Sequence, residues 1–465
     1  MTGFETIGNA TVTVIDRDRP VLTTDPWIAG EPYFGSWTAP FEIPATQLEH
    51  VLDAEFVWLS HGHPDHVHMA SLEKLTGKQI LLPDHVGGRM AHDLGSLGFS
   101  VRILPDRQWV RLSPQVRVMC ISDYHQDAVL LIDVAGQLVV NLNDAVERGW
   151  GRFVCNRIKE YKVSFLLKLF GYGDVDMINI FREDGTHLMH APPTASPEAL
   201  AQWDAYLAEK VRFWTGYFGT TYVVPFSIFH AYQRKDSLWA REYVTPLDAY
   251  QRIRLPKGTE MLPAFGEWDV EREQWTPLSP KRRNISVREP KEFGDDWSEM
   301  LDPSEAKAVA EYFQRIEFLR DKLDAIRFRV GGREHTIDIG KQTGRSMTFE
   351  APRHSLVEAV RMEVFDDILI SNFAKLTLHG DWGTSLAPNV LYRHFTPWVV
   401  RYADNGRVRT NAALEEYFEQ YRRRARLEYV LHSFEQEGVQ RLRAMIHPGT
   451  FLFRTASRLY GLAKR

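Results

Sequence analysis

The feature that most constrains this chain is the run His61-Gly62-His63-Pro64-Asp65-His66, which directly follows the apolar segment Phe56–Ser60. Three imidazoles and a carboxylate thus come together at the end of a segment with the length of a buried strand. Burying so many ionisable groups is costly unless a metal ion or charged partners compensate them. The run therefore predicts a metal site at the carboxyl end of a strand.

The spacing within the run predicts a site for two metal ions. His61 and His63 are two positions apart on an extended segment, so their rings can point to one metal. Asp65 and His66 then reach a second metal a few ångströms away. His68 falls on the first turn of an expected helix and faces the site or its entrance, and whether it is a ligand stays open.

A dinuclear site needs further ligands, and three candidates lie downstream. His125 follows the predicted strand Val116–Ser122 after a short turn. Asp144 ends the predicted strand Gln137–Leu142, and its carboxylate can bridge two cations, which an imidazole normally cannot. His230 lies beyond another predicted strand and completes the second site. All of these donors are nitrogen or oxygen, which suits iron, zinc or manganese without selecting one of them.

The pattern of elements predicts a layered α/β catalytic domain over residues 1–290, because short strands are followed by alternating strands and helices. The charged, proline-containing stretch Arg288–Glu292 indicates a boundary. A small α+β domain is expected at 300–395 and a helical region at 396–465. The expected elements beyond the boundary are a helix at Ser304–Leu323, strands at Ile326–Ile339 and Ser346–Glu350, a helix or helix plus strand at Leu356–Ile370, a long helical region of two helices at Ala412–Met445 and an amphipathic basic tail at Phe451–Arg465.

Composition argues against several classes of protein. A formal net charge of -5 lacks the basic footprint of a nucleic-acid-binding protein. No apolar stretch reaches the roughly 18 residues of a membrane span, and the N-terminus lacks the pattern of a signal peptide. The two cysteines, Cys120 and Cys155, have no CxxC spacing and are expected to be reduced thiols. We therefore expect a cytoplasmic protein, and the long helical C-terminal region is compatible with a homodimer.

The run from His61 to His66, together with His125 and Asp144, resembles the metallo-β-lactamase superfamily, which implies an αββα sandwich. A narrower resemblance is to the CMP-N-acetylneuraminate hydroxylases. It is carried by Asp25-Pro26-Trp27, Gly35-Ser36-Trp37, Leu59-Ser60-His61-Gly62-His63, Val224-Pro225-Phe226 and, towards the C-terminus, Asp366–Phe373. Those hydroxylases carry a Rieske-type iron–sulfur region whose cysteines are missing here, which implies a separate electron donor.

The sequence also resembles the nonheme diiron monooxygenases of bacterial secondary metabolism, such as the platensimycin–platencin diterpenoid hydroxylase, including the stretch Phe229–Ser237. This resemblance implies two irons, O2 as co-substrate, and hydroxylation of a C–H bond in a small molecule that is carrier-bound or CoA-linked. The alternative is a dinuclear zinc or manganese hydrolase of a lactone, thioester or phosphoester, in which Asp65 doubles as a proton acceptor. The candidate pocket walls are the aromatic-rich segments Trp27–Trp37 and Phe165–Phe181, and the candidate anion-binding residues are Arg234, Lys235, Lys159 and Lys162.

Overall fold

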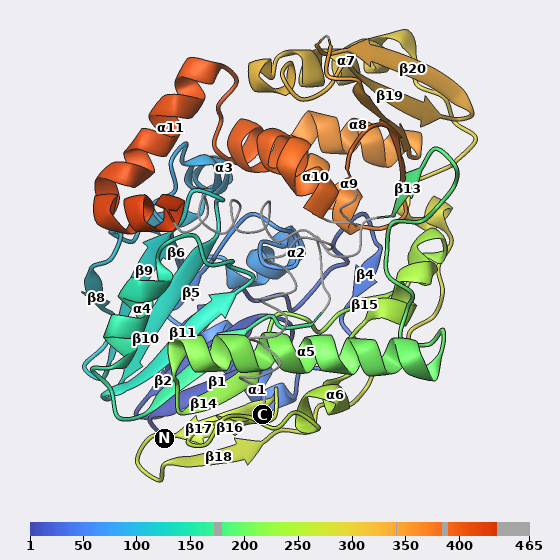
Figure 1. Ribbon diagram of the computed structural model, residues 1–465. Coiled ribbons are helices and arrows are strands. Elements are labelled where there is room, and N and C mark those ends of the chain that lie inside the picture. The colour runs from blue at the N-terminus through green and yellow to red at the C-terminus, as the bar shows by residue number, and fades with distance from the viewer. Residues whose placement is uncertain (172–178, 341, 384–388, 435–465) are drawn as a thin grey trace, which may run out of the picture.

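The computed structural model describes residues 1–171, 179–340, 342–383 and 389–434, and within them three large β-sheets are surrounded by helices (Figure 1). The first sheet has the strand order β18-β17-β1-β2-β3-β5-β6-β7. Its strands are β1 (Gly3–Ile7), β2 (Thr11–Asp16), β3 (Arg19–Thr24), β5 (Phe56–Trp58), β6 (Gln79–Leu82), β7 (Ser100–Ile103), β17 (Gly266–Asp269) and β18 (Gln274–Pro277). Strands β3, β5, β6 and β7 are parallel, so their carboxyl ends lie at the same edge.

The second sheet has the order β16-β14-β12-β11-β10-β9-β8. Its strands are β8 (Trp109–Arg111), β9 (Val116–Ser122), β10 (Ala128–Val134), β11 (Gln137–Asn143), β12 (Ser164–Lys168), β14 (Tyr222–Pro225) and β16 (Glu260–Met261). Strands β11, β12, β14 and β16 are parallel. Each of the two sheets therefore gathers several strand ends at one edge, where loops can bring side chains together.

The two sheets pack face to face, and helices cover both outer faces. The core between them contains Val14 and Trp58 from the first sheet and Leu130 and Phe165 from the second. Outside the first sheet lie α1 (Ala45–Asp53), α2 (Met69–Leu72) with the 3₁₀ turn Glu73–Leu75, and α3 (Arg89–Ser96). Outside the second sheet lie α4 (Gly151–Ile158), α5 (Pro197–Phe218) and α6 (Leu247–Gln251). This unit is an αββα sandwich, the architecture that the resemblance to the metallo-β-lactamase superfamily implied.

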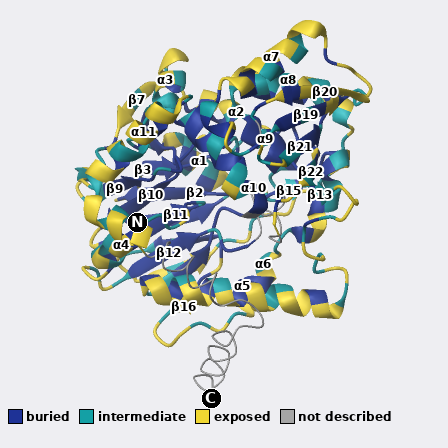
Figure 2. Cartoon of the chain, turned by 45° about the horizontal axis from the view of Figure 1, so that its top comes forward, coloured by how far each residue is buried: buried dark blue, intermediate teal, exposed yellow. Residues whose placement is uncertain are grey.

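Helix α5 shows how the sequence sets these elements. Ser196 caps its first turn by accepting the Ala199 N–H, Pro197 occupies the first helical position, and Gly219 ends the helix in the left-handed region. Its inner face is buried on the second sheet, while its outer face is exposed to solvent (Figure 2).

The third sheet, at the top of Figure 1, has the order β13-β22-β21-β19-β20. Its strands are β13 (Ile180–Arg182), β19 (Ala325–Val330), β20 (Arg333–Asp338), β21 (Arg345–Glu350) and β22 (Lys375–Gly380). The helices of this part are α7 (Pro303–Gln314), α8 (Arg353–Met362), α9 (Phe365–Ile370), α10 (Asn389–His394), a π-helix (Pro397–Asn405) and α11 (Asn411–Arg424). Their common core, which includes Phe313, Phe349 and Tyr402, also packs against Val86 and Tyr124 of the sandwich.

Short connecting elements complete the described chain. The 3₁₀ helices Lys235–Tyr243, Pro290–Phe293 and Glu317–Leu319 lie between the larger elements. Strands β4 (Trp37–Thr38) and β15 (Ala231–Tyr232) pair with each other and join the segment after β3 to the segment after β14. No helix in the described ranges has the length and apolar character that crossing a bilayer requires.

Several expected elements beyond residue 300 were wrong in extent. The segment Ile326–Ile339 is a hairpin rather than one strand, because Gly331 and Gly332 both take positive φ angles of 57° and 79°. The segment Leu356–Ile370 contains two helices, separated where Glu363 takes a φ of 54°. The helix expected at Ser304–Leu323 ends at Gln314. The two helices expected at Ala412–Met445 are confirmed in the described part of that region, where α11 is followed by a second helical stretch from residue 426, while Phe451–Arg465 lies outside the described residues.

Candidate metal centre

The loop that carries the histidine run is fixed at both ends by the sandwich. It leaves β5 at the parallel edge of the first sheet, and the Ser60 backbone N–H donates to Oδ1 of Asp25, 2.7 Å away. Within the loop, the backbone N–H groups of His66 and Val67 donate to the His63 carbonyl at 3.0 and 2.8 Å. This turn places the side chains of the run against one another in the interior.

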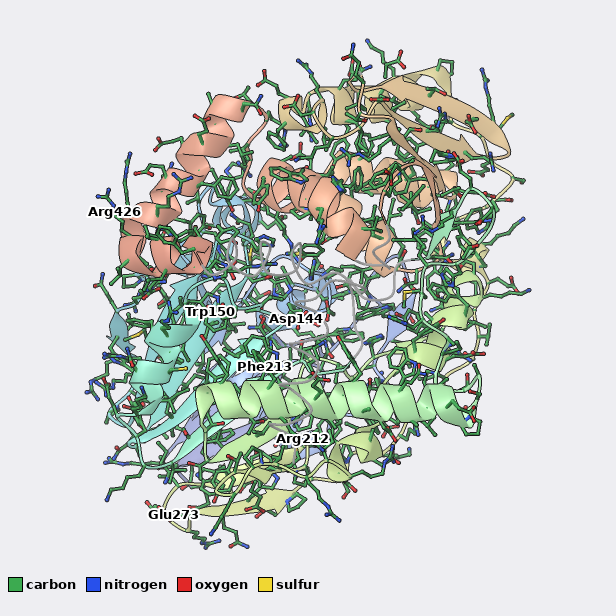
Figure 3. All side chains as sticks on the ribbon, in the orientation of Figure 1. Asp144, Trp150, Arg212, Phe213, Glu273 and Arg426 are labelled. Atoms are coloured by element: carbon green, nitrogen blue, oxygen red, sulfur yellow. The ribbon has the colours of Figure 1, made fainter. Side chains whose placement is uncertain are left out.

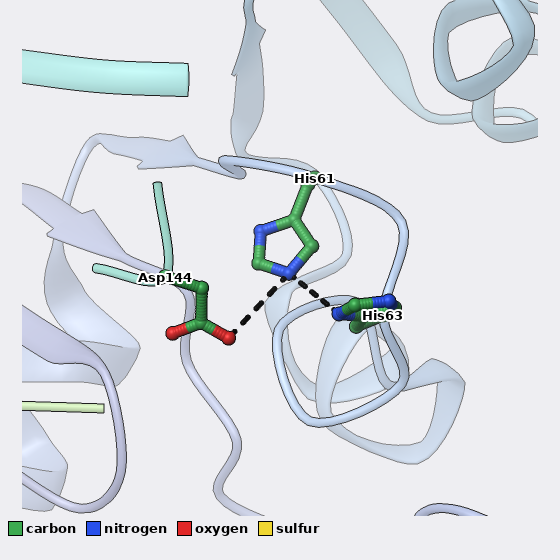
Figure 4. Close-up of side chains that lie close together, drawn as sticks. All are labelled: His61, His63 and Asp144. Atoms are coloured by element: carbon green, nitrogen blue, oxygen red, sulfur yellow. Dashed lines mark hydrogen bonds and ion pairs between the residues drawn. The ribbon is translucent and has the colours of Figure 1, made fainter. Parts of the chain in front are cut away.

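His61, His63 and Asp144 form one group of potential ligands (Figure 4). Nε2 of His61 lies 2.9 Å from Nδ1 of His63 and 3.9 Å from Oδ2 of Asp144. One ligand atom from each residue lies within 4.8 Å of the other two. Both rings are buried, and Asp144 arrives from the loop after β11, at the parallel edge of the second sheet. Two imidazole nitrogens and a carboxylate oxygen that converge in this way can hold one metal ion.

A second group of potential ligands shares Asp144 with the first. Nε2 of His66 lies 3.5 Å from Oδ2 of Asp144 and 3.4 Å from Oδ2 of Asp65. Since Oδ2 of Asp144 also faces His61, one carboxylate oxygen lies between the two groups. That is the position from which a carboxylate bridges two cations.

Polar neighbours contact the side chains of both groups of potential ligands. Nδ1 of His61 lies 2.8 Å from the Ser60 hydroxyl, and Nδ1 of His66 lies 3.2 Å from Oδ2 of Asp25. The carboxylates have partners as well: Asp65 accepts from Tyr33 Oη at 2.6 Å and from Asn9 Nδ2 at 2.7 Å, and Asp144 accepts from the Ser227 hydroxyl. Such partners fix the tautomer and direction of metal ligands.

The electrostatics of the site favour a bound cation. Burial lowers the pKa of His66, but the carboxylates of Asp65, Asp144 and Asp25 outweigh this effect and raise that pKa well above its ordinary value. Burial would raise the pKa of Asp144, yet His66 and the Ser227 hydroxyl lower it. By contrast, burial lowers the pKa of His61 well below its ordinary value. The site thus combines a neutral imidazole, that of His61, with carboxylates that require a compensating positive charge beside His66.

His125 and His230 lie outside the group formed by His61, His63 and Asp144 in the described part of the chain. Nε2 of His125 lies 3.3 Å from the Tyr402 hydroxyl, and its buried Nδ1 makes no hydrogen bond within the described residues. The His230 ring stacks on Trp37 with centroids 3.5 Å apart and planes at 4°. Neither of its nitrogens has a hydrogen-bond partner among these residues, and burial lowers its pKa to about 3. Burial also lowers the pKa of His125 well below its ordinary value, so both imidazoles are neutral, and their ligation stays a prediction.

The donor set fits the metals expected from the sequence. It contains only nitrogen and oxygen donors, and buried ring nitrogens of His125 and His230 remain without partners within the described ranges. Unpartnered polar atoms of this kind are rare in protein interiors and call for an explanation. Iron, zinc and manganese all accept such donors.

Two residues near the run have roles in positioning and packing. His68 caps α2, its Nδ1 accepting from the Ala70 N–H at 3.3 Å. A Cβ on Gly30, whose φ is 85°, would overlap the His68 ring, so only glycine allows this approach. Of the aromatic segment Trp27–Trp37, Tyr33 contacts Asp65 and Trp37 contacts His230.

The expectation that Arg234 binds an anionic substrate was wrong. Its guanidinium is fully buried and forms ion pairs with the carboxylates of Asp236 and Asp295, with N–O distances of 2.8 and 2.6 Å. It also stacks over the Phe373 ring, 3.8 Å from the centroid. Lys235 is exposed and pairs with Glu289. Arg234 therefore fastens the chain after β15 to the linker that precedes α7.

Sequence reasoning missed one contact of the site. Nε2 of His63 lies 2.9 Å from Oδ2 of Asp366 on α9, 303 residues along the chain. Asp366 belongs to the C-terminal stretch that resembles the hydroxylases, but nothing in its local sequence distinguishes it from a helix-surface carboxylate. Burial raises the pKa of Asp366, and the hydrogen bond from His63 and the charge of Arg401 outweigh it, so that the pKa lies below its ordinary value.

Comparison with known proteins shows similarity to hydroxylases of a CMP-sugar. The chain is 26% identical over 161 residues to the human inactive cytidine monophosphate-N-acetylneuraminic acid hydroxylase, covering 33% of this chain and 31% of that one. It is 28% identical over 141 residues to the Asterias rubens cytidine monophosphate-N-acetylneuraminic acid hydroxylase, covering 28% and 22%. The chain thus spans about a third or less of the length of these relatives. No family model matches.

Solved structures were compared as well. Igni18, a metallo hydrolase from Ignicoccus hospitalis, matches at 17% identity with a TM-score of 0.35, covering 56% of this chain and 97% of that one. CmlA, a diiron β-hydroxylase from Streptomyces venezuelae, matches at 16% identity with a TM-score of 0.34, covering 49% and 44%.

Proposed function

We propose that this chain is a nonheme diiron monooxygenase that hydroxylates a C–H bond of a small-molecule substrate with O2. The observation that carries the proposal is the single oxygen of Asp144 between His61 and His66, 3.9 and 3.5 Å away, which suits a pair of metal ions bridged by a carboxylate. The similarity to proteins named as hydroxylases supports oxidative rather than hydrolytic chemistry.

The residues of this chain would divide the work of the centre. One iron would be held by His61, His63 and His125. The other iron would be held by Asp65, His66 and His230. Asp144 would contact both. Two bound irons supply the redox chemistry that O2 activation needs. Buried Tyr33 and Trp37 exclude water on the side of Asp65 and His230 and keep these side chains in place.

The remaining expectations belong to the same proposal. Cys120 is buried in β9 and Cys155 lies in α4, so the two thiols do not form a cluster site, and electrons would come from a separate donor. Free thiols agree with a cytoplasmic location. The substrate would be a small molecule, with a CoA-linked intermediate as the first class to test, and a homodimer is the oligomeric state we would examine first.

A zinc or manganese hydrolase is the second candidate, because the donor set lacks any thiolate or other feature that selects iron. These metals would supply Lewis-acid chemistry for cleavage of a lactone, thioester or phosphoester. Asp65 would then serve as a proton acceptor, although both of its oxygens already accept hydrogen bonds, from Tyr33 and Asn9.

The two candidates are separated by loading the metal-free protein anaerobically with Fe²⁺ or Zn²⁺. We expect the iron-loaded protein to consume O2 in the presence of a chemical reductant faster than free iron does, and the Asp144→Ala variant not to do so. The zinc-loaded protein should leave model lactones, thioesters and phosphodiesters intact. Zinc-dependent cleavage of these esters, with no protein-dependent O2 uptake, would replace the oxygenase with the hydrolase.

A further inference from the structure

The C-terminal part of the chain contacts two of the candidate ligands, His63 and His125. Asp366, buried on the first turn of α9, lies 2.9 Å from Nε2 of His63. Tyr402, in the π-helix, places its hydroxyl 3.3 Å from Nε2 of His125. In both histidines the contact occupies Nε2, which leaves Nδ1 directed elsewhere. For His63 that other nitrogen is the one that faces His61.

Arg401, the residue before Tyr402, lies between Asp366 and the segment that follows His125. Nη2 of Arg401 lies 3.9 Å from Oδ2 of Asp366, and its Nη1 lies 3.5 Å from Oδ1 of Asp127, two residues after His125. All three side chains are buried. A buried carboxylate is stable only with a compensating charge or hydrogen bonds, and Asp366 has Arg401 as well as His63. Because π-helical turns are rare and often occur at functional sites, the location of Arg401 and Tyr402 is a further sign of function.

We propose that Asp366 is a positioning residue of the metal centre, which holds the proton of His63 on Nε2 and thereby presents the Nδ1 lone pair to the metal. The C-terminal part of the chain, through Asp366, is then a component of the centre and not an appendage to it. The inference rests on the metal site of the proposed function but not on its reaction, since it applies equally to iron and zinc.

The physical reason is that an imidazole has two nitrogens and only one can bind a given metal. A carboxylate that accepts from one nitrogen fixes the tautomer, restrains rotation of the ring and makes the other nitrogen a better donor. Loss of such a partner typically weakens metal binding about 10- to 100-fold. Here the partner comes from a separate sheet-and-helix unit, so metal affinity depends on how that unit packs.

The test compares Asp366→Asn with Asp367→Asn, its neighbour on the same helix. Asp367 carries the same side chain on the same turn of α9, whereas the contact with His63 is made by Asp366. Co²⁺ and Zn²⁺ affinities would be measured by competition with a chelating dye. We expect about 10- to 100-fold weaker binding and an altered Co²⁺ absorption spectrum for Asp366→Asn, and wild-type behaviour for Asp367→Asn.

A double-mutant cycle with His63→Ala shows whether Asp366 acts through His63. In that background, Asp366→Asn should weaken binding no further. Three results would each overturn the proposal. They are wild-type affinity in Asp366→Asn, equal losses of affinity in Asp366→Asn and Asp367→Asn, and additive losses of Asp366→Asn and His63→Ala in the cycle. If the wild-type protein bound no metal at all, the metal centre itself would fail, which is a different result.

A measurement on the wild-type protein covers the case in which Asp366→Asn does not fold. In ¹⁵N-histidine correlation spectra of the zinc-loaded protein, with His63 assigned from a His63→Gln variant, we expect its proton on Nε2 and coordination through Nδ1. Coordination through Nε2 would contradict the proposal without any variant at Asp366.

Discussion

At the scale of single residues, the position of one oxygen distinguishes a two-metal centre from a one-metal centre. Oδ2 of Asp144 faces His61 from one group of ligands and His66 from the other. Its hydrogen bond from Ser227 restrains the carboxylate. Figure 3 shows Asp144 below the helices of the C-terminal part. Because the Asp144 carboxylate lies between the two groups of candidate ligands, substitution of Asp144 should affect both of the proposed metal ions.

We expect Asp144→Asn to lower the bound metal from about two ions per chain to about one or none, because a neutral amide bridges cations poorly. The measurement is metal content by mass spectrometry after equal loading. Asp133→Asn is the matched control, since Asp133 lies on β10 and pairs with Arg117 at 2.8 Å, away from the site. Two metals in Asp144→Asn would show that Asp144 does not bridge.

Gly30 provides a second prediction at this scale. Gly30→Ala and Gly98→Ala share the cost of a positive φ, at 85° and 86°, which is about 1–2 kcal/mol. Only at Gly30 would the new Cβ meet another side chain, that of His68. We expect Gly30→Ala to lose about 1–3 kcal/mol more in unfolding free energy than Gly98→Ala, measured by denaturant unfolding. Equal losses would mean that the His68 ring moves away freely.

At the scale of elements, the π-helix Pro397–Asn405 contains several buried polar groups. It contributes Arg401 and Tyr402 to the surroundings of the metal site and Asp404 to the packing of α7. Asp404 accepts a hydrogen bond from Tyr312, and Arg315 and Arg409 lie 3.7 and 3.8 Å from its other oxygen. Burial nevertheless raises the pKa of Asp404 to about 7.

This shift predicts a stability that depends on pH. A folded-state pKa above the unfolded value favours folding while the group is protonated, and this contribution is lost as pH rises from about 4 through about 7. Relative to Asp404→Asn, the unfolding free energy of the wild type should therefore fall between pH 5 and pH 8. Denaturant unfolding of both metal-free proteins over this range measures the difference. A constant difference would mean that Asp404 is already ionised at pH 5.

Local patterns in the sequence predicted the sandwich better than the remainder of the fold. Strand β9 was expected with the bounds that it has, because its apolar run ends at clear turn residues. Strand β22 was missed, since its alternation of Leu376 and Leu378 with polar residues is short. The break at Glu363 was missed because a non-glycine residue takes the left-handed conformation there.

The residues of the candidate site also differ in how clearly the local sequence identifies them. His61, His63, Asp65 and His66 are adjacent in sequence, and Asp144 ends a clear strand, so the structure places together residues that the sequence could identify. Asp366 and Tyr402 reach the site only through tertiary packing of a separate unit, and their sequence surroundings resemble those of ordinary helices. Whether these residues bind or orient a metal stays a prediction.

At the scale of the whole molecule, the candidate metal site lies where two units meet. The parallel edges of both sheets of the sandwich supply the candidate ligands, and α9 and the π-helix contact two of them, His63 and His125. The same side is occupied by Val86 and Tyr124, which pack into the C-terminal core. Metal binding should therefore stabilise both units together.

Removing the metal should loosen more than the histidine loop. We expect hydrogen exchange to become faster on chelation both in residues 59–68 and in residues 365–371 and 397–405, because these segments are linked through Asp366 and Tyr402. At free metal about 100 times Kd the bound form gains about 2.7 kcal/mol, which a thermal unfolding scan also detects. A change confined to residues 59–68 would contradict this coupling.

The most direct test of the central claim is the identity and number of metals that the protein takes up when both are offered. The protein would be expressed in medium supplied with iron and zinc, purified without chelators and analysed by mass spectrometry for metal per chain. The account predicts about two irons per chain, as a carboxylate-bridged diiron site requires. About two zincs with little iron would contradict the oxygenase and favour the hydrolase, and less than one metal per chain would contradict the dinuclear centre itself.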